Sequence, residues 1–104
     1  MAKRTPPTFP AAARQLAALG ERLRAARRRR RLTQAVVAAR VGVSKQTIAK
    51  LEAGNPATSL ATMLRVLQVL GLGEQIDRLA ADDELGRRLQ DLDLRDPPRG
   101  RSVR

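Results

Sequence analysis

The chain has 104 residues and a formal net charge of +11, and it contains neither cysteine nor histidine. This length leaves room for one small domain, and the missing residue types exclude disulfides, thiolate zinc sites and the commonest general base. No apolar run approaches the roughly 20 residues of a membrane span, and residues 1–10 lack the apolar core of a signal peptide.

The charge is distributed unevenly along the chain. Residues 1–31 carry ten basic groups and one acidic group, about +9 by counting, whereas residues 55–96 carry five basic and eight acidic groups, about −3. A surplus of positive charge at one end of the chain favours a polyanionic partner for that end alone, either nucleic acid or an anionic surface.

The N-terminal third predicts an arm followed by a helix. Residues 1–10 contain three prolines and are predicted to be a disordered arm. Phe9 either anchors that arm on the domain or is solvated. Residues 11–31 are rich in Ala, Leu and Arg, which favour a helix. Gly20 within them is either a weak point in one long helix or a break between two.

Two short helices are expected next. Thr33 is a suitable N-cap for a helix over residues 34–40, and Ser44 for one over residues 45–53. Gly42 supplies the positive φ that a tight turn between them needs. Gly54 ends the second of these helices. Val37, Ala38, Ile48 and Leu51 are expected to face inward.

The remainder predicts a fourth helix, capped by Thr58 or Ser59 and ending near Leu70, that is apolar enough to be buried on most sides. A short fifth helix is expected over residues 74–81, contributing Ile76, Leu79 and Ala80 to the core. The expected fold is all-α: a compact five-helix domain over residues 11–81, followed by a tail over residues 82–104 that is acidic and then basic. Leu85, Leu89 and Leu92 support one or two further amphipathic turns in that tail.

Two short helices joined by a three-residue turn form a helix-turn-helix. The outer face of its second helix is expected to enter a DNA major groove. Gln46 can pair with an adenine edge, and Lys45 can donate to guanine. The N-terminus of the preceding helix, at Thr33 and Gln34, offers N–H groups to a phosphate.

The run LTQxxxAxxxGVSxxTIxxLExG, from Leu32 to Gly54, resembles the Cro/C1-type (XRE) family of phage repressors and bacterial regulators. The resemblance implies a lambda-repressor-like domain that binds operator DNA as a homodimer. It also implies an internal pair between Arg27 and Glu52. The residues that it implies to contact DNA are Gln34, Lys45, Gln46, Thr47, Lys50 and Asn55. Thr33 and Ser44, at the starts of the two helices, complete the expected set of DNA-binding residues.

The flanking runs QLAALGERLRAAR, SLATMLRVLQVLGL and DDELGRRLQDLDL resemble a narrower group, the HipB-type regulators encoded beside HipA-like serine/threonine kinases. That resemblance implies an antitoxin that represses its own operon in the bacterial cytoplasm. Two alternatives stay open: a subunit that inhibits or scaffolds a HipA-like kinase, with DNA binding secondary, and a stand-alone regulator.

Catalysis is not expected, because the chain shows no nucleophile–base pair and no phosphate loop, and no cofactor or metal is expected. Asp82, Asp83 and Glu84 are consecutive and point in different directions, so favourable charge at a helix N-terminus explains them more simply than a metal site. A single aromatic residue provides no stacking platform for single-stranded nucleic acid.

Overall fold

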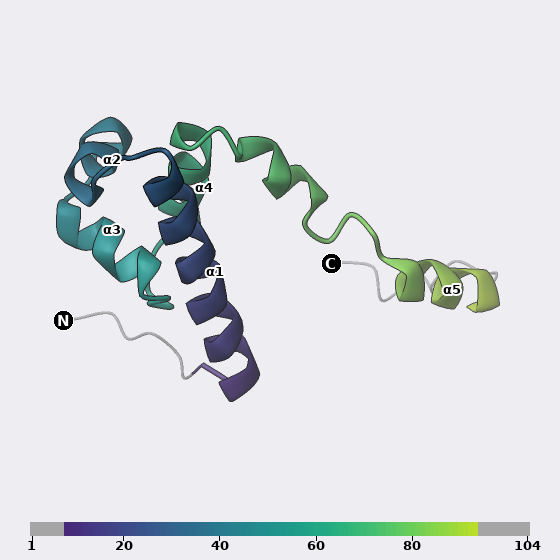
Figure 1. The fold of residues 1–104 in the computed structure, drawn as a ribbon. Helices are drawn as coiled ribbons and strands as arrows, with labels where there is room; N and C mark the ends of the chain where they lie inside the picture. Colours follow the sequence, from purple (N-terminus) through teal and green to yellow (C-terminus); the bar gives the residue numbers. More distant parts are fainter. Residues whose placement is uncertain (1–7, 94–104) are drawn as a thin grey trace.

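A computed structural model describes residues 8–93, and every regular element in that range is helical (Figure 1). The expected all-α class is confirmed. The elements in chain order are α1 (Pro10–Arg29), α2 (Gln34–Val41), α3 (Lys45–Glu52), α4 (Leu60–Val69), the 3₁₀ helix η1 (Gly73–Arg78) and α5 (Glu84–Asp93). Most of the expected N-terminal arm, and the tail from residue 94, lie outside the described residues. No helix among the described residues is long and apolar enough to cross a membrane.

Side-chain caps fix where three of the helices begin. The hydroxyl oxygens of Thr33, Ser44 and Ser59 each accept a hydrogen bond from the backbone N–H three residues further on, at 3.1, 3.1 and 3.0 Å. Each cap satisfies one of the N–H groups that a helix start leaves unpaired. Ser59, rather than Thr58, is therefore the cap of α4. Gly42 closes α2 with a φ of 89°, as the turn requires.

The core lies between the first four helices. Val37 of α2 and Ile48 of α3 are its most deeply buried side chains, so the two helices of the helix-turn-helix are locked against each other. The buried apolar residues are Leu23, Ala26, Val37, Ala38, Val41, Ile48, Leu51, Val66, Leu67 and Leu70. The inward-facing residues expected in α2 and α3 are all among them.

Two expectations for the second half of the domain were wrong. The apolar fourth helix is not buried on most sides, because its neighbours cover one face only and Leu60 stays 70% exposed. The fifth helix is a 3₁₀ helix from Gly73 to Arg78, and only Ile76 packs against the core. Leu79 and Ala80 are exposed, because Ala80 adopts a φ of 59° and the chain turns outward there.

The last helix belongs to the segment that was expected to follow the five-helix domain, and it lies apart from the other helices. Figure 1 shows α5 projecting away from the bundle beyond η1. Asp83 begins this helix: its carboxylate accepts a hydrogen bond from the N–H of Gly86 at 2.9 Å. The leucine-bearing turns expected in the acidic tail thus form a ten-residue helix.

Gly20 does not break α1, which runs through it without interruption. It is buried where α1 crosses the end of α3, and a Cβ added there would overlap the carbonyl oxygen of Glu52 and lie 2.9 Å from that of Leu51. Glycine is therefore needed at this position for the close approach of two backbones, which is a tertiary contact and not a feature of α1 itself.

We expect Gly20→Ala to destabilise the protein by about 1–3 kcal/mol, although alanine is the better helix former, because the added methyl group forces α1 and α3 apart. Chemical denaturation measures this change. Gln15→Ala, at an exposed position of the same helix, is the control and should change the free energy of unfolding by less than about 0.5 kcal/mol. Equal effects of the two substitutions would contradict the close-approach explanation.

Candidate nucleic-acid interface

The outward face of α3 carries a row of polar side chains. Lys45, Gln46 and Lys50 are exposed, and within residues 8–93 their side chains make no hydrogen bond or ion pair. Ser44 and Thr47 lie beside them, with their hydroxyl oxygens 3.0 Å apart, and the Ser44 hydroxyl is already occupied in capping α3. Three long side chains on one rigid helix are thus free to bind a ligand.

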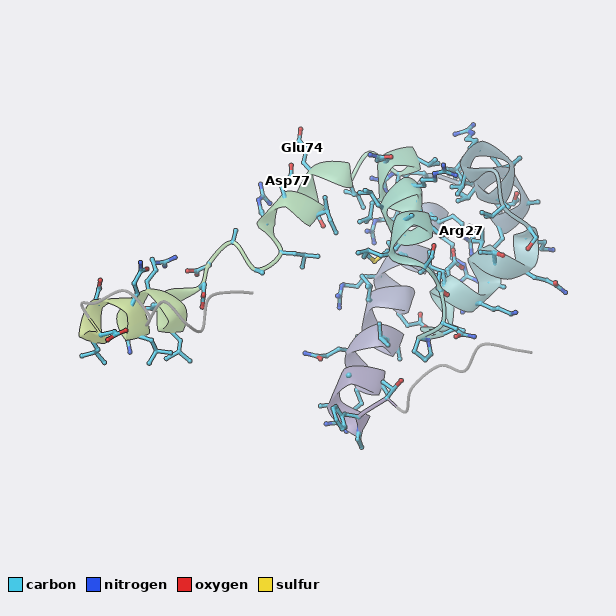
Figure 2. All side chains as sticks on the ribbon, turned by 180° about the vertical axis from the view of Figure 1, so that it is seen from behind. Arg27, Glu74 and Asp77 are labelled. Carbon is cyan, nitrogen blue, oxygen red and sulfur yellow. The ribbon has the colours of Figure 1, made fainter. Side chains whose placement is uncertain are left out.

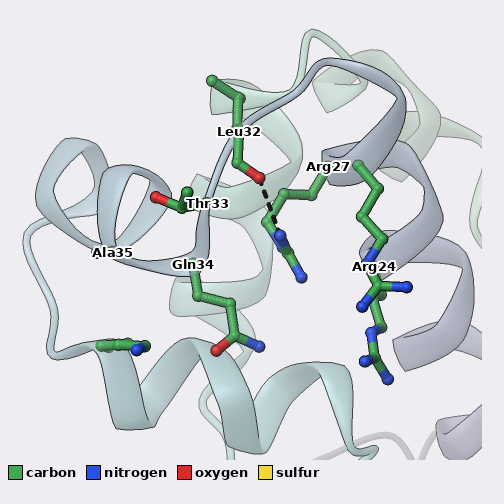
Figure 3. Close-up of a pocket in the computed structure, with 8 residues that line it drawn as sticks. Arg24, Arg27, Leu32, Thr33, Gln34 and Ala35 are labelled. Carbon is green, nitrogen blue, oxygen red and sulfur yellow. Dashed lines mark hydrogen bonds between the residues drawn. The ribbon is translucent and has the colours of Figure 1, made fainter.

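A hollow lies between α1, the start of α2 and the start of α3, and we call it the α2 hollow (Figure 3). Four of its lining side chains are basic. The lining residues are Arg24, Arg27, Arg28, Leu32, Thr33, Gln34, Ala35 and Lys45. Because the first turn of α2 also directs N–H groups outward here, the α2 hollow is suited to a phosphate group.

Arg24 also lines this hollow, although its sequence position alone did not indicate a role in binding. Its Nε atom is buried and, among the described residues, has no hydrogen-bond partner. Figure 3 shows Arg24 beside Arg27 at the wall that α1 contributes. Its spacing was the available signal, because residues three and four apart on a helix, here Arg24 with Arg27 and Arg28, share one face.

A second hollow, the α4 hollow, lies at the other end of α3. Its lining residues are Thr47, Lys50, Asn55, Ala57, Thr58, Ser59 and Thr62. The side-chain oxygen of Asn55 accepts a hydrogen bond from the N–H of Ala57 at 2.8 Å, which leaves the amide N–H groups of Asn55 available. The structure therefore brings Thr33, Gln34 and Lys45 together at one hollow, and Thr47, Lys50 and Asn55 together at the other.

A buried ion pair lies beneath the α2 hollow and ties three helices together. Nε and Nη2 of Arg27 donate to the two carboxylate oxygens of Glu52 at 2.7 and 3.0 Å, and Nη1 of Arg27 donates to the carbonyl of Leu32 at 2.9 Å. The amide of Gln34 donates to the same carboxylate at 2.9 Å. The structure thus contains the Arg27–Glu52 pair that the sequence implied. It also shows that Gln34 commits one amide hydrogen to the pair and keeps the other.

These contacts determine the ionisation of both partners. The hydrogen bond to Glu52 raises the pKa of Arg27, despite the opposing effect of burial. Burial alone would raise the pKa of Glu52. The hydrogen bonds from Arg27 and Gln34, with the charges of Arg27 and Arg24, outweigh that effect and lower the pKa. Glu52 is therefore ionised and neutralised locally.

The charges of the chain are separated in space as they are in sequence. Arg30 donates to the carbonyl of Ala26 at 2.8 Å at the end of α1, so not every arginine of the run from Arg27 to Arg31 is available to a ligand. Figure 2 shows Glu74 and Asp77 projecting from η1, apart from the position of Arg27. The basic side chains that line the α2 hollow thus lie away from the acidic end.

An exposed polar helix, locked by a tight turn against a second helix and flanked by two polar hollows, defines a helix-turn-helix nucleic-acid-binding protein. A family model described as a helix-turn-helix domain matches residues 18–79, and the chain belongs to that family. It is a DNA-binding regulator, of a family that is typically non-enzymatic. Comparisons with curated proteins and with solved structures gave no match.

We expect Arg27→Ala to destabilise the fold by about 3–5 kcal/mol, because it leaves the Glu52 carboxylate buried without its cation. Equilibrium unfolding in denaturant measures the loss. Arg87→Ala is the matched control: it removes an arginine paired with Asp82 at 3.1 Å on the surface, and it should cost less than about 1 kcal/mol. Similar losses in the two variants would show that burial of the Arg27 pair is unimportant.

Stability should also depend on pH through Glu52. Because the folded-state pKa is lowered, this contribution is complete above the unfolded-chain value of about 4.3 and is lost as the pH falls through the folded-state pKa. The free energy of unfolding should therefore fall less steeply on acidification in Glu52→Gln than in the native chain. Glu84→Gln, whose carboxylate is exposed, should follow the native curve. Parallel curves for native protein and Glu52→Gln would refute the assignment.

Proposed function

We propose that this regulator is a sequence-specific repressor that binds a two-fold symmetric operator as a homodimer, with α3 in the major groove. The observation that carries this proposal is the row of Lys45, Gln46 and Lys50 on α3, exposed and without partners within residues 8–93. A rigid helix that presents unpaired donors is what base recognition requires. The two hollows at its ends support the proposal, because each offers polar or basic groups to a phosphate on one side of the groove.

Each proposed DNA-binding residue has a role that follows from its position. Lys45 and Gln46, at the start of α3, recognise base edges. Lys50 and Asn55 bind phosphate at the α4 hollow. Thr33 and Gln34 present the start of α2 to another phosphate, with Arg24, Arg28 and Lys45 adding positive charge. Ser44 and Thr47 complete the contact surface while holding the first turn of α3.

We further propose that the repressor is the antitoxin and autorepressor of a HipBA-type operon in the bacterial cytoplasm. The support is the likeness of the flanking sequence runs to HipB-type regulators, with a HipA-like kinase as the partner. A second candidate is an interaction subunit for such a kinase in which DNA binding is secondary. The exposed acidic residues Asp82, Asp83 and Glu84 favour that candidate, because negative charge outside the bundle is available to a protein partner and not to DNA.

The proposed function is tested by selecting duplexes from a random pool with the purified protein at physiological salt. We expect a palindrome whose half-sites lie about one helical turn, roughly 34 Å, apart. The logarithm of affinity should fall with the logarithm of salt concentration by about 0.9 for each phosphate neutralised. Failure to enrich any sequence, together with a flat salt response, would contradict the repressor assignment.

Two variants separate base recognition from phosphate binding. Lys45→Ala combined with Gln46→Ala should relax the preference at one or two base pairs, by about 1–3 kcal/mol each. Lys50→Ala should weaken all sequences similarly and lower the salt slope by about one. Arg87→Ala on α5 removes the same charge far from α3 and should alter neither property. An unchanged preference in the double variant would refute the assignment of Lys45 and Gln46.

A further inference from the structure

The last helix has an apolar face that the bundle does not cover. Leu85, Leu89 and Leu92 are 66, 56 and 79% exposed. Their spacing of four and then three residues places them in one row, which we call the leucine seam. This spacing matches positions d, a and d of a heptad repeat, the pattern by which helices pair in coiled coils. A row of exposed leucines on an otherwise charged helix indicates a partner.

We propose that the leucine seam pairs in parallel with the leucine seam of a second copy of this chain. The proposal rests on the proposed two-fold dimer on DNA and names the surface that joins its halves. Parallel pairing of identical helices about a two-fold axis gives a closed dimer and matches the symmetry of a palindromic site.

The charges beside the seam favour a second copy in parallel orientation. Arg88 occupies heptad position g and Asp93 position e. In a parallel pair, each g residue faces the e residue five positions further along the partner, so Arg88 of each chain meets Asp93 of the other. An antiparallel pair would instead place Arg88 opposite Arg88. The charges beside the seam are therefore complementary in a parallel pair and not in an antiparallel one.

The other charges of α5 do not oppose this arrangement. Glu84, Arg87 and Asp91 occupy heptad positions c and f, on the side away from the seam. Asp93 already makes an interaction within the chain. Arg88 has an internal partner as well, because its Nη2 lies 3.4 Å from the Glu84 carboxylate. That pair is about 70% exposed at both side chains and is weak enough to exchange for a contact with a second chain.

The size of α5 sets the strength expected of this pairing. A ten-residue helix is about 15 Å long and covers much less than the roughly 800 Å² per partner of a stable interface. Pairing is therefore weak between free chains and becomes effective when two copies occupy adjacent half-sites, where their effective concentration approaches the millimolar range. Because α5 stands clear of the bundle in Figure 1, two copies can meet without disturbing α3.

Single cysteines test the pairing without requiring a known operator, because the chain has no cysteine of its own. In a parallel pair, Leu85→Cys and Leu92→Cys each meet their own counterpart within disulfide distance. Under mild oxidation, full-length Leu85→Cys and Leu92→Cys should each form disulfide-linked dimers about tenfold faster than Gln90→Cys, which lies on the opposite face. Equal rates for all three variants would overturn the proposal and leave a different protein as the partner of the seam.

Orientation and charge are tested in the same assay. Mixing Leu85→Cys with Leu92→Cys should give mainly the two homodimers, whereas predominance of the mixed disulfide would show antiparallel pairing and overturn the proposal. Adding Arg88→Asp or Asp93→Arg to Leu85→Cys should slow cross-linking, and mixing these two double variants should restore the rate in the mixed dimer. No restoration would overturn the charge pairing.

The same variants distinguish failure of this proposal from failure of the proposed function. Cross-linking is measured first without DNA and then with the selected duplex, which should accelerate it. Rapid, orientation-specific cross-linking in a chain that selects no duplex would uphold the pairing and contradict the repressor. Sequence-specific binding to a palindrome without seam-specific cross-linking would uphold the repressor and contradict the pairing.

Discussion

The Arg27–Glu52 pair is the interaction on which the position of the recognition helix depends. Arg27 belongs to α1, Glu52 is the last residue of α3, and Gln34, the first residue of α2, donates to the same carboxylate. Side chains on a helix lean toward its N-terminus, so Arg27 reaches back along α1 to where Gly20 admits the end of α3. Two contacts of different kinds, one ionic and one steric, thus hold the same helix end.

The neutralisation of Glu52 also shapes the electrostatics of the proposed interface. A free carboxylate beside the α2 hollow would repel a phosphate, and an unpaired one would be costly to bury. Instead, the carboxylate oxygens of Glu52 accept hydrogen bonds from Arg27 and Gln34 within the protein. The positive charge of Arg24, Arg28 and Lys45 is therefore left to face outward. The ion pair that fixes the position of α3 therefore also leaves the surface beside it positively charged.

The fold and the site were predictable to different depths. Caps, turn and core of the helix-turn-helix followed from local chemistry, because Thr33, Ser44 and Gly42 each act within a few residues of their own position. The role of Gly20 and the unpartnered Nε of Arg24 depend on which elements pack together, which no local pattern states.

The errors in the second half of the domain have a related cause. The composition of α4 indicates how much apolar surface needs covering, but not how many neighbours are present to cover it, and Leu60 therefore stays exposed. In the same way, Leu79 has the spacing of a core residue, yet the chain leaves the bundle at that point. The roles of the proposed DNA-binding residues remain predictions, since the structure gives their positions and not their ligand.

The separation of charge within the chain gives the proposed pairing of α5 a physical rationale. Two copies whose basic faces approach the same DNA repel each other until the phosphates neutralise them. An interface built on those faces would oppose DNA binding, whereas one on α5 lies at the acidic end and does not compete with it. A short seam adds little stability to a dimer that is free in solution. It adds more when both chains are already bound to DNA, because the effective concentration of the two seams, and not their contact area, then determines how strongly they pair. Weak pairing at the end remote from α3 would make occupancy of one half-site dependent on the other, which is the property that a two-fold operator requires.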